Sequence, residues 1–246
     1  MKIILNGANG RMGRIMTELI AAREGFELAA RVDRFGDADY AALEGCEVSA
    51  DIVIDFSNHA ATAELMDWCR RRKMPVIVAT TGQTEAEMEM IREAAREIPV
   101  FLSANMSIGV ALLAELAKKA ASVFPDADIE IIERHHNQKL DVPSGTALLL
   151  ANRLREARPD ARFVVGRHEN GKREPREIGI HSLRYGGEVG THEIIIATGK
   201  ETFTLRHEAE NRALFADGAL AAAAFMAGKA PGLYDMRDII SEERRP

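Results

Sequence analysis

The sequence is poor in cysteine. Only Cys46 and Cys69 occur among its 246 residues, and neither lies in a C-x-x-C pair or near a histidine at metal-ligand spacing. We therefore expect neither a disulfide framework nor a cysteine-based zinc site. This usage favours two free thiols in a cytoplasmic protein, and we expect no metal site.

Long hydrophobic runs are missing as well. No apolar run approaches the roughly 18 residues of a membrane span, and the stretch ALAAAAFMAG near the end is short and dominated by alanine. The sequence opens on a strand-like KIIL, without a charged segment, an apolar segment and a cleavage site in succession. We therefore expect a cytoplasmic protein with no membrane partner.

Positive charge is in short supply, because 32 Lys and Arg residues are set against 38 Asp and Glu residues. The formal net charge of −6 predicts no nucleic-acid partner, since binding a phosphate backbone needs a basic surface. A small anionic substrate needs only a locally basic pocket and is still allowed. With 46% hydrophobic and 28% charged residues, the composition is that of an ordinary globular protein.

The first hundred residues alternate between short β-branched runs and segments with helical spacing. Such an alternation predicts βαβ units around a parallel sheet, and therefore an α/β fold. The expected strands are 2–7, 26–33, 51–57, 75–82 and 99–107, and the expected helices between them are 11–23, 60–73 and 85–98.

A different pattern begins at residue 108. One long apolar helix is predicted over 108–124, a strand over 129–134, and a helix from Ser144 to about Ala157. Extended runs then follow one another with no helix between them, which predicts a second sheet with a different role. These runs are 161–166, 177–185, 191–197 and 201–209, and after them a helix over 212–228 and a short tail are expected.

The turn after the first expected strand carries a glycine pattern. Gly7, Gly10 and Gly13 follow the spacing G-x-x-G-x-x-G, and Asp33 ends the second expected strand. Such glycines let a pyrophosphate approach the backbone at a helix N-terminus, and the acid can accept hydrogen bonds from a ribose. The pattern predicts a dinucleotide site, although a glycine turn that merely packs a helix on a strand has the same sequence. No P-loop pattern is present, so an NTPase is not expected.

Two neighbouring residues bear on the choice of coenzyme. The carboxylate of Asp33 favours the ribose hydroxyls of NADH, whereas the guanidinium of Arg34 can pair with the 2′-phosphate of NADPH. We therefore expect both NADH and NADPH to be used. Ligands of an open parallel sheet bind beyond the C-terminal ends of its strands, and two small polar loops, Ala79 to Gly82 and Ser103 to Met106, follow expected strands there.

Several proton carriers lie close together in the stretch EIIERHHNQKLDVPSGTA, residues 130–147. His135 or His136 can carry a proton near neutral pH, and Lys139 supplies a cation or a proton. This grouping predicts proton chemistry, while the alternative interpretation is a pair of surface histidines.

The same stretch ends in a turn suited to an anion. Ser144 is a plausible N-cap for the helix that follows, and the N–H groups of Gly145 and Thr146 could hold a carboxylate. The alternative is a capped helix with no ligand.

At this point the sequence resembles the 4-hydroxy-tetrahydrodipicolinate reductase family, also called dihydrodipicolinate reductase, of the diaminopimelate and lysine pathway. The likeness implies an NAD(P)H-dependent reductase acting on a small dicarboxylate. It implies a Rossmann-like dinucleotide-binding domain, 1–107 with 210–246, and a smaller α+β domain with an open mixed sheet, 108–209, that binds substrate and forms a homotetramer. The stretches that carry it are NGANGRMG, VATTG, SANMSIG, ERHHNQKLDVPSGTA and HEAENRALFADGA.

The resemblance also implies roles for single residues. His135 corresponds to the proton donor and acceptor, Lys139 to the proton donor, and His136 to a substrate-binding position. Gly145 and Thr146 match the carboxylate-binding turn. The cofactor positions, to which Arg34 is added for the reason above, are Gly7, Ala8, Asn9, Gly10, Arg11, Met12, Asp33, Arg34, Ala79, Thr80, Thr81, Ser103, Ala104, Asn105 and Met106.

Two other functions remain as alternatives. Another Rossmann dehydrogenase of the aspartate pathway, such as a semialdehyde dehydrogenase, would need a reactive cysteine, and neither cysteine has an obvious partner. A non-enzymatic nucleotide-sensing module would need no proton donors, so the histidines and Lys139 speak against it.

Overall fold

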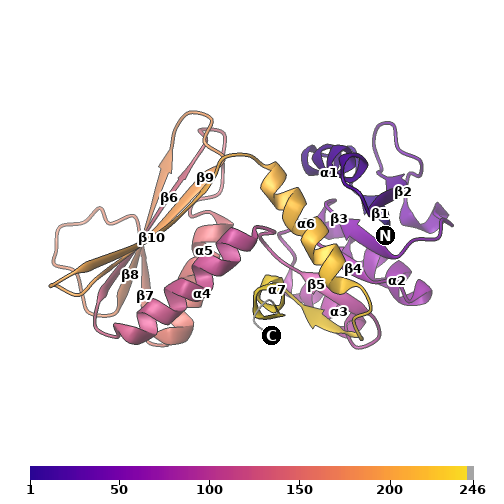
Figure 1. Cartoon of the computed structure of the whole chain (residues 1–246). Helices are drawn as coiled ribbons and strands as arrows, with labels where there is room; N and C mark the ends of the chain where they lie inside the picture. Colours follow the sequence, from indigo (N-terminus) through magenta and orange to yellow (C-terminus); the bar gives the residue numbers. More distant parts are fainter. Residues whose placement is uncertain (243–246) are drawn as a thin grey trace. The chain divides into compact units, whose positions relative to one another are not determined.

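The computed structural model describes residues 1–242, which fall into two compact units (Figure 1). Unit 1 consists of Met1–Ser107 together with Ala213–Pro246, whose last four residues lie outside the described part, and unit 2 of Ile108–Arg212. The chain thus leaves unit 1 once and returns to it. The sequence-based boundaries were 107/108 and 209/210, and the contacts place them at Ser107/Ile108 and Arg212/Ala213.

Unit 1 is built on a parallel sheet of six strands in the order β11-β5-β4-β3-β1-β2. Because β1 pairs with both β2 and β3, the chain winds outward from β1 in two directions, which is the doubly wound pattern of Rossmann-like domains. The strands are β1 (Lys2–Asn6), β2 (Glu27–Val32), β3 (Ile52–Asp55), β4 (Val76–Val78), β5 (Pro99–Leu102) and β11 (Gly232–Tyr234).

Helices of unit 1 connect these strands as the alternation of the sequence predicts. Each expected strand and helix of the first hundred residues is present, although most are a few residues shorter, because the chain leaves the sheet to form loops at the strand ends. The helices are α1 (Arg11–Ala22), α2 (Thr62–Arg72), α3 (Glu85–Ala94), α6 (Ala213–Met226) and α7 (Met236–Glu242), with short 3₁₀ turns at Leu43–Gly45 and His59–Ala61.

The short tail expected after residue 228 contains two further elements, which the sequence analysis did not predict. Gly232–Tyr234 forms β11, which pairs with β5 at the edge of the sheet, and Met236–Glu242 forms α7. A strand of three residues is too short to show a period of two in the sequence. Its position is fixed instead by pairing with β5 and by the edge-to-face contact of Tyr234 with Phe225, whose ring centroids lie 5.8 Å apart.

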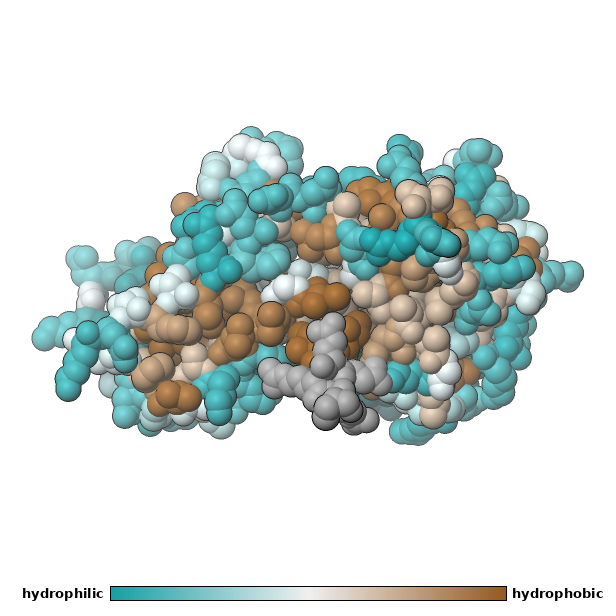
Figure 2. Space-filling view, in the orientation of Figure 1, coloured by the Kyte–Doolittle hydropathy of each residue, from teal (hydrophilic) through white to brown (hydrophobic). Residues whose placement is uncertain are grey.

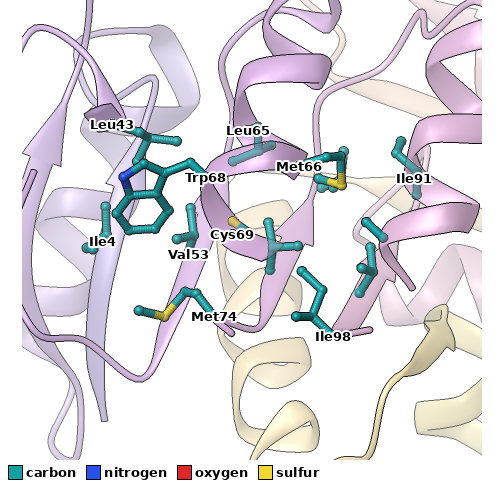
Figure 3. Close-up of a cluster of buried hydrophobic side chains, with 14 of the residues drawn as sticks. Ile4, Leu43, Val53, Leu65, Met66, Trp68, Cys69, Met74, Ile91 and Ile98 are labelled. Atoms are coloured by element: carbon teal, nitrogen blue, oxygen red, sulfur yellow. The ribbon is translucent and has the colours of Figure 1, made fainter. Parts of the chain in front are cut away.

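The core between the sheet of unit 1 and its helices α2 and α3 is apolar and closed to solvent (Figure 3). Trp68, only 2% exposed, packs there against side chains from the strands, and both cysteines are buried in the same cluster. The strands contribute continuous apolar runs because helices cover them, as is usual for parallel sheets.

Unit 2 contains the second sheet that the extended runs predict, in the order β10-β9-β6-β8-β7. It is mixed, because β6, β8 and β7 run parallel while β9 runs antiparallel to both β6 and β10. The strands are β6 (Asp128–His135), β7 (Arg162–Val165), β8 (Glu177–Arg184), β9 (Gly190–Ala197) and β10 (Thr202–Ala209).

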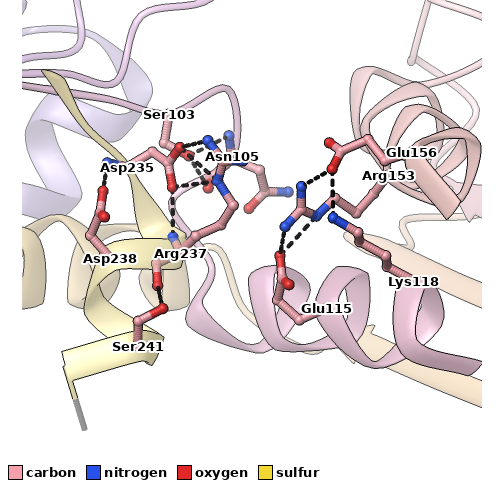
Figure 4. Close-up of polar contacts among 10 residues, drawn as sticks. All are labelled: Ser103, Asn105, Glu115, Lys118, Arg153, Glu156, Asp235, Arg237, Asp238 and Ser241. Atoms are coloured by element: carbon pink, nitrogen blue, oxygen red, sulfur yellow. Dashed lines mark hydrogen bonds and ion pairs between the residues drawn. The ribbon is translucent and has the colours of Figure 1, made fainter. Parts of the chain in front are cut away.

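The helices α4 (Ile108–Val123) and α5 (Gly145–Ala157) lie on the same side of this sheet (Figure 1). They join it in an apolar core that includes Ile131, Leu150 and Ile194, each 0% exposed. A polar network also links the two helices: Arg153 of α5 pairs with Glu115 of α4 and with Glu156, and Glu156 pairs with Lys118 (Figure 4). These ion pairs hold α5 against α4.

On the face seen in Figure 2, hydrophobic residues gather over the part of unit 2 that holds α4 and α5. Ile108, Leu112 and Leu116 of α4 are each at least 36% exposed, so α4 is apolar both toward the core and toward its surface. Among residues 1–242 no helix is both long enough and apolar enough to cross a membrane.

Candidate active site

The glycine turn between β1 and α1 has the geometry that a dinucleotide needs. Gly7 adopts a φ of +82°, and a Cβ there would lie 2.6 Å from the carbonyl of Phe56. A Cβ on Gly13 would overlap the carbonyl oxygen of Gly7, so only glycine lets α1 start this close to the turn. Gly10 is the N-cap of the helix and makes no side-chain capping bond, and the first N–H groups of a helix, here those of Arg11 and Met12, have no acceptor within the helix.

A cavity of about 730 Å³ opens beside this turn. Four residues predicted for the cofactor, Gly7, Gly10, Asp33 and Arg34, lie in its wall. The sequence reasoning missed the rest of the wall, which comes from the end of β1, the loops after β2 and β3 and the start of α2: Asn6, Phe35, Ala41, Ala42, Leu43, Phe56, Ser57, Asn58, Ala60, Ala61, Glu64 and Leu65.

At one side of this cavity, Asp33 connects the glycine turn after β1 to the loop after β2. Its carboxylate accepts hydrogen bonds from the backbone N–H groups of Asn9 at 2.8 Å and of Phe35 at 2.9 Å. A carboxylate has about four acceptor positions, so others remain for ribose hydroxyls. Arg34 is exposed next to it.

The two predicted strand-end loops follow β4 and β5. Thr80 and Ser103 are buried, while Thr81 and Ala104 are exposed. The Ser103 hydroxyl donates to the carbonyl oxygen of Asn105 at 2.7 Å, which folds that loop back on itself (Figure 4).

A buried carboxylate that the sequence reasoning missed anchors the first of these loops. Asp55, at the end of β3, is 2% exposed and accepts hydrogen bonds from Asn6 at 2.8 Å, Ser57 at 2.6 Å and Thr80 at 2.7 Å. Burial raises the pKa of the Asp55 carboxyl, because these neutral donors offset only part of the lost hydration. Three strand ends of unit 1 are thereby tied together.

The predicted proton carriers lie in unit 2, where β6 ends. His135 is the last residue of β6 and is 7% exposed. Its Nδ1 lies 2.5 Å from a carboxylate oxygen of Glu133, which is fully buried two residues earlier on the same face of the strand. Arg184 of β8 pairs with both oxygens of that carboxylate, at 2.7 and 2.8 Å.

The predicted anion turn forms next to this histidine. Ser144 caps α5, since its hydroxyl accepts a hydrogen bond from the N–H of Ala147 at 3.2 Å, as expected. Its own backbone N–H donates to Glu133 at 3.2 Å. Gly145 and Thr146 therefore begin the helix at the place where Glu133 and His135 lie.

Lys139 already contacts a carboxylate at this turn. Its Nζ lies 2.9 Å from Asp141, and only 23% of its side chain is exposed. The pKa of the Asp141 carboxyl is lowered overall. Burial acts to raise it, but the Lys139 ammonium and backbone N–H groups, including that of Gly145, outweigh burial. Lys139 and the start of α5 thus act together on one carboxylate of the chain itself.

His136 and His192 complete the surroundings. The Nε2 of His136 lies 3.3 Å from a guanidinium nitrogen of Arg212, and the backbone N–H of His136 donates to the backbone carbonyl oxygen of Glu188 at 2.8 Å. The buried His192 of β9 lies 3.2 Å from the Ser144 hydroxyl, and its ring meets that of His135 edge to face at 5.1 Å.

The sequence reasoning missed Glu133, Arg184 and His192. A signal was present for Glu133, because positions 129, 131, 133 and 135 alternate onto the buried face of β6, where an acid needs a partner. Arg184 and His192 carry no such signal, since they reach the site only through strand pairing.

The cysteines do not offer the nucleophile that a semialdehyde dehydrogenase needs. Cys46 and Cys69 are both 0% exposed, and burial raises the pKa of the Cys69 thiol. No group of three or more His, Cys, Asp or Glu side chains within residues 1–242 is arranged to hold a metal ion.

Comparison with known proteins gives one consistent result. The family model for the N-terminus of dihydrodipicolinate reductase matches residues 1–106, and the model for its C-terminus matches residues 109–240. The 4-hydroxy-tetrahydrodipicolinate reductases of Caldanaerobacter subterraneus subsp. tengcongensis and Clostridium novyi are each 43% identical over 98% of this chain and 99% of theirs. The structure of dipicolinate-bound dihydrodipicolinate reductase from Paenisporosarcina sp. TG-14 superposes with a TM-score of 0.80 at 27% identity, covering 96% of this chain and 97% of that one.

We predict that His192 makes the stability of the protein fall in acid. Burial, with His135 adding to it, lowers the pKa of His192 from 6.5 to about 3, so the folded chain keeps this ring neutral where the unfolded chain protonates it. The contribution of neutral His192 to the free energy of unfolding is therefore complete above pH 6.5. It is lost as the pH falls toward about 3.

Urea unfolding between pH 7 and pH 4 measures this effect. In His192→Gln the slope of unfolding free energy against pH should shrink by up to one proton, or about 1.4 kcal/mol per pH unit. His168→Asn, at an exposed histidine of unit 2, should keep the wild-type slope. An unchanged slope in His192→Gln would contradict the prediction.

Proposed function

The chain belongs to the dihydrodipicolinate reductase family, and from this we propose that it reduces 4-hydroxy-tetrahydrodipicolinate to tetrahydrodipicolinate in the biosynthesis of lysine and diaminopimelate. The reaction adds one hydride and one proton and releases one water. The structural observation that supports it is the contact of Lys139 and the start of α5 with one carboxylate, that of Asp141. The cap of the same helix, Ser144, is bonded to Glu133, the partner of His135.

We propose that this turn holds a carboxylate of the substrate. Gly145 offers a backbone N–H at the start of α5, and the positive end of the helix dipole favours an anion there. The contacts of the Asp141 carboxylate with Lys139 and with the Gly145 N–H support this proposal. Thr146 and His136 lie at the same end of unit 2 and are assigned to substrate binding with Gly145.

The proton comes from the same cluster. Hydride addition leaves electron density on the nitrogen side of the substrate ring, so a nearby acid lowers the barrier. Lys139 holds its protons at Nζ, and His135 has its Nδ1 engaged by Glu133, which leaves Nε2 to exchange a proton. We assign Lys139 as the proton donor and His135 as the donor and acceptor.

The cofactor is a nicotinamide dinucleotide, and the residues of unit 1 fit it. The close packing at Gly7 and Gly13 and the neighbouring cavity suit a pyrophosphate and a ribose, which Asp33 can bind. When bound, the nicotinamide supplies the hydride. The other positions assigned to it are Ala8, Asn9, Gly10, Arg11, Met12, Arg34, Ala79, Thr80, Thr81, Ser103, Ala104, Asn105 and Met106.

Lys139→Ala should lower kcat by about 10²- to 10⁴-fold, the usual contribution of a positioned acid, and leave the Kd for NADH unchanged. Oxidation of NADH in the presence of 4-hydroxy-tetrahydrodipicolinate is the assay. The matched control is Lys118→Ala, which removes another ion-paired lysine of unit 2 and should keep the wild-type kcat. A wild-type kcat in Lys139→Ala would rule out the assigned role.

Both coenzymes should support turnover, with NADH equal or preferred by no more than about tenfold in kcat/KM, or roughly 1.4 kcal/mol. Asp33 favours the free ribose and Arg34 rescues the 2′-phosphate. Arg34→Ala should therefore lower kcat/KM for NADPH and spare NADH. Arg23→Ala, which removes an exposed arginine paired with Asp217, serves as the control. Equal losses with both coenzymes in Arg34→Ala would show that Arg34 does not read the phosphate.

We also propose that the chain forms a homotetramer through the sheet of unit 2. Both helices of the unit cover one face of that sheet, and the other face carries Ile132, Leu183 and Ile195 without a covering helix among the described residues. Light scattering at micromolar concentration should give about four times the chain mass of 27.0 kDa, and Ile195→Lys should lower it. A wild-type mass of one chain would refute the assembly.

A further inference from the structure

We propose that Glu133 is the positioning residue of the reaction, because one buried carboxylate fixes both the ring of His135 and the start of α5. The inference rests on the proposed function in one respect, namely that His135 carries the proton.

Arg184 donates to both oxygens of Glu133, and each oxygen has one further partner of its own. One lies 2.5 Å from His135 Nδ1, and the other accepts the backbone N–H of Ser144 at 3.2 Å. Ser144 is the N-cap of α5, so the second bond fixes the point from which the N–H groups of the anion turn begin. A shift of this carboxylate would therefore move the proton carrier and the turn together.

Arg184 makes it possible to bury this charge. Glu133 is 0% exposed, and an isolated carboxylate in that position would be costly. The guanidinium of Arg184 donates to both its oxygens and, at 2.8 Å, to the carbonyl oxygen of Asp141. The pKa of Glu133 is lowered overall, so its carboxylate is ionised. Burial acts to raise this pKa, but the bonds from His135 and Arg184 outweigh burial.

An ionised carboxylate sets the tautomer of His135. Since it can only accept, Nδ1 of the ring must carry a hydrogen, and Nε2 becomes the atom that gains and loses the proton. Gly190 of β9 leaves room at that atom, because a Cβ at this position would lie 2.8 Å from Nε2. The pair thus resembles the acid–histidine arrangement in which a buried carboxylate orients a catalytic imidazole.

The other charged and titratable groups near Glu133 and His135 come from the elements packed against β6. Arg184 lies on β8 and His192 on β9, while His207 of β10 and Lys139, which follows β6, act electrostatically on His192. His192 contacts the ring edge to face and is kept neutral by burial. Glu133 is the acid that hydrogen-bonds to the ring.

The same strand offers a matched control. Glu130 lies on the opposite face of β6 and also joins an arginine and a histidine, with Arg173 Nε at 3.2 Å and His181 Nε2 at 2.8 Å. Glu133→Gln and Glu130→Gln therefore make the same chemical change in two similar triads, only one of which contains His135.

The first test is ¹⁵N NMR of histidine-labelled protein, with the His135 signal assigned by its loss in His135→Asn. We expect the Nδ1–H tautomer in the wild type and in Glu130→Gln. Glu133→Gln should lose that preference, because an amide can donate to Nδ1. A wild-type pattern in Glu133→Gln would overturn the proposal.

The second test is turnover. Glu133→Gln should lower kcat by about 10²- to 10⁴-fold and move the pH profile of kcat to lower pH, since the imidazolium loses its carboxylate. The Kd for pyridine-2,6-dicarboxylate should change little, because the glutamine oxygen can still accept from Ser144. Glu130→Gln should keep the wild-type profile. Equal profiles in both variants, or a loss confined to binding, would overturn the positioning role.

If Glu133→Gln does not fold, the double variant Glu133→Gln/Arg184→Met removes the guanidinium left without its partner, and the same measurements apply to it. The two proposals fail separately. A chain with the expected tautomers and no turnover of 4-hydroxy-tetrahydrodipicolinate would contradict the proposed function and leave the role of Glu133 in orienting His135 intact.

Discussion

The structure depends on how it satisfies carboxylates buried near the ends of its central strands. An acid removed from water must find several donors inside the chain, and the elements that supply them become fixed relative to one another. In unit 1 this acid is Asp55, which binds side chains at the ends of β1, β3 and β4. In unit 2 it is Glu133, which joins β6, β8 and the start of α5.

The two acids differ in charge balance, and their ionisation differs accordingly. Asp55 has only neutral donors, so burial raises its pKa. Glu133 has the guanidinium of Arg184, and its pKa is lowered in spite of burial. The neutral donors around Asp55 suit a place where the carboxylate has only to hold the backbone in position. The charged set keeps an anion hydrogen-bonded to an imidazole, which is the arrangement that the proposed role of His135 requires.

Sequence reasoning succeeded where a pattern repeats over many residues or where chemistry requires a particular residue. The alternation of strands and helices predicted the parallel sheet of unit 1, and the unbroken series of extended runs predicted the second sheet. Ser144 caps α5 as expected. The method failed at β11, where three residues are too few to show a period, and where pairing with β5 supplies the stability that the local sequence lacks.

The sequence by itself determined the fold class, the glycine turn at Gly7 to Gly13, and the grouping of His135, Lys139 and the turn at Gly145 within a dozen residues, because those features are local. Only the tertiary structure decided what surrounds them. Arg184 and His192 are separated from His135 by 49 and 57 positions in the sequence and reach it through the register of β8 and β9. Strand register is set by the whole buried face of a sheet, so no single stretch of the sequence contains it.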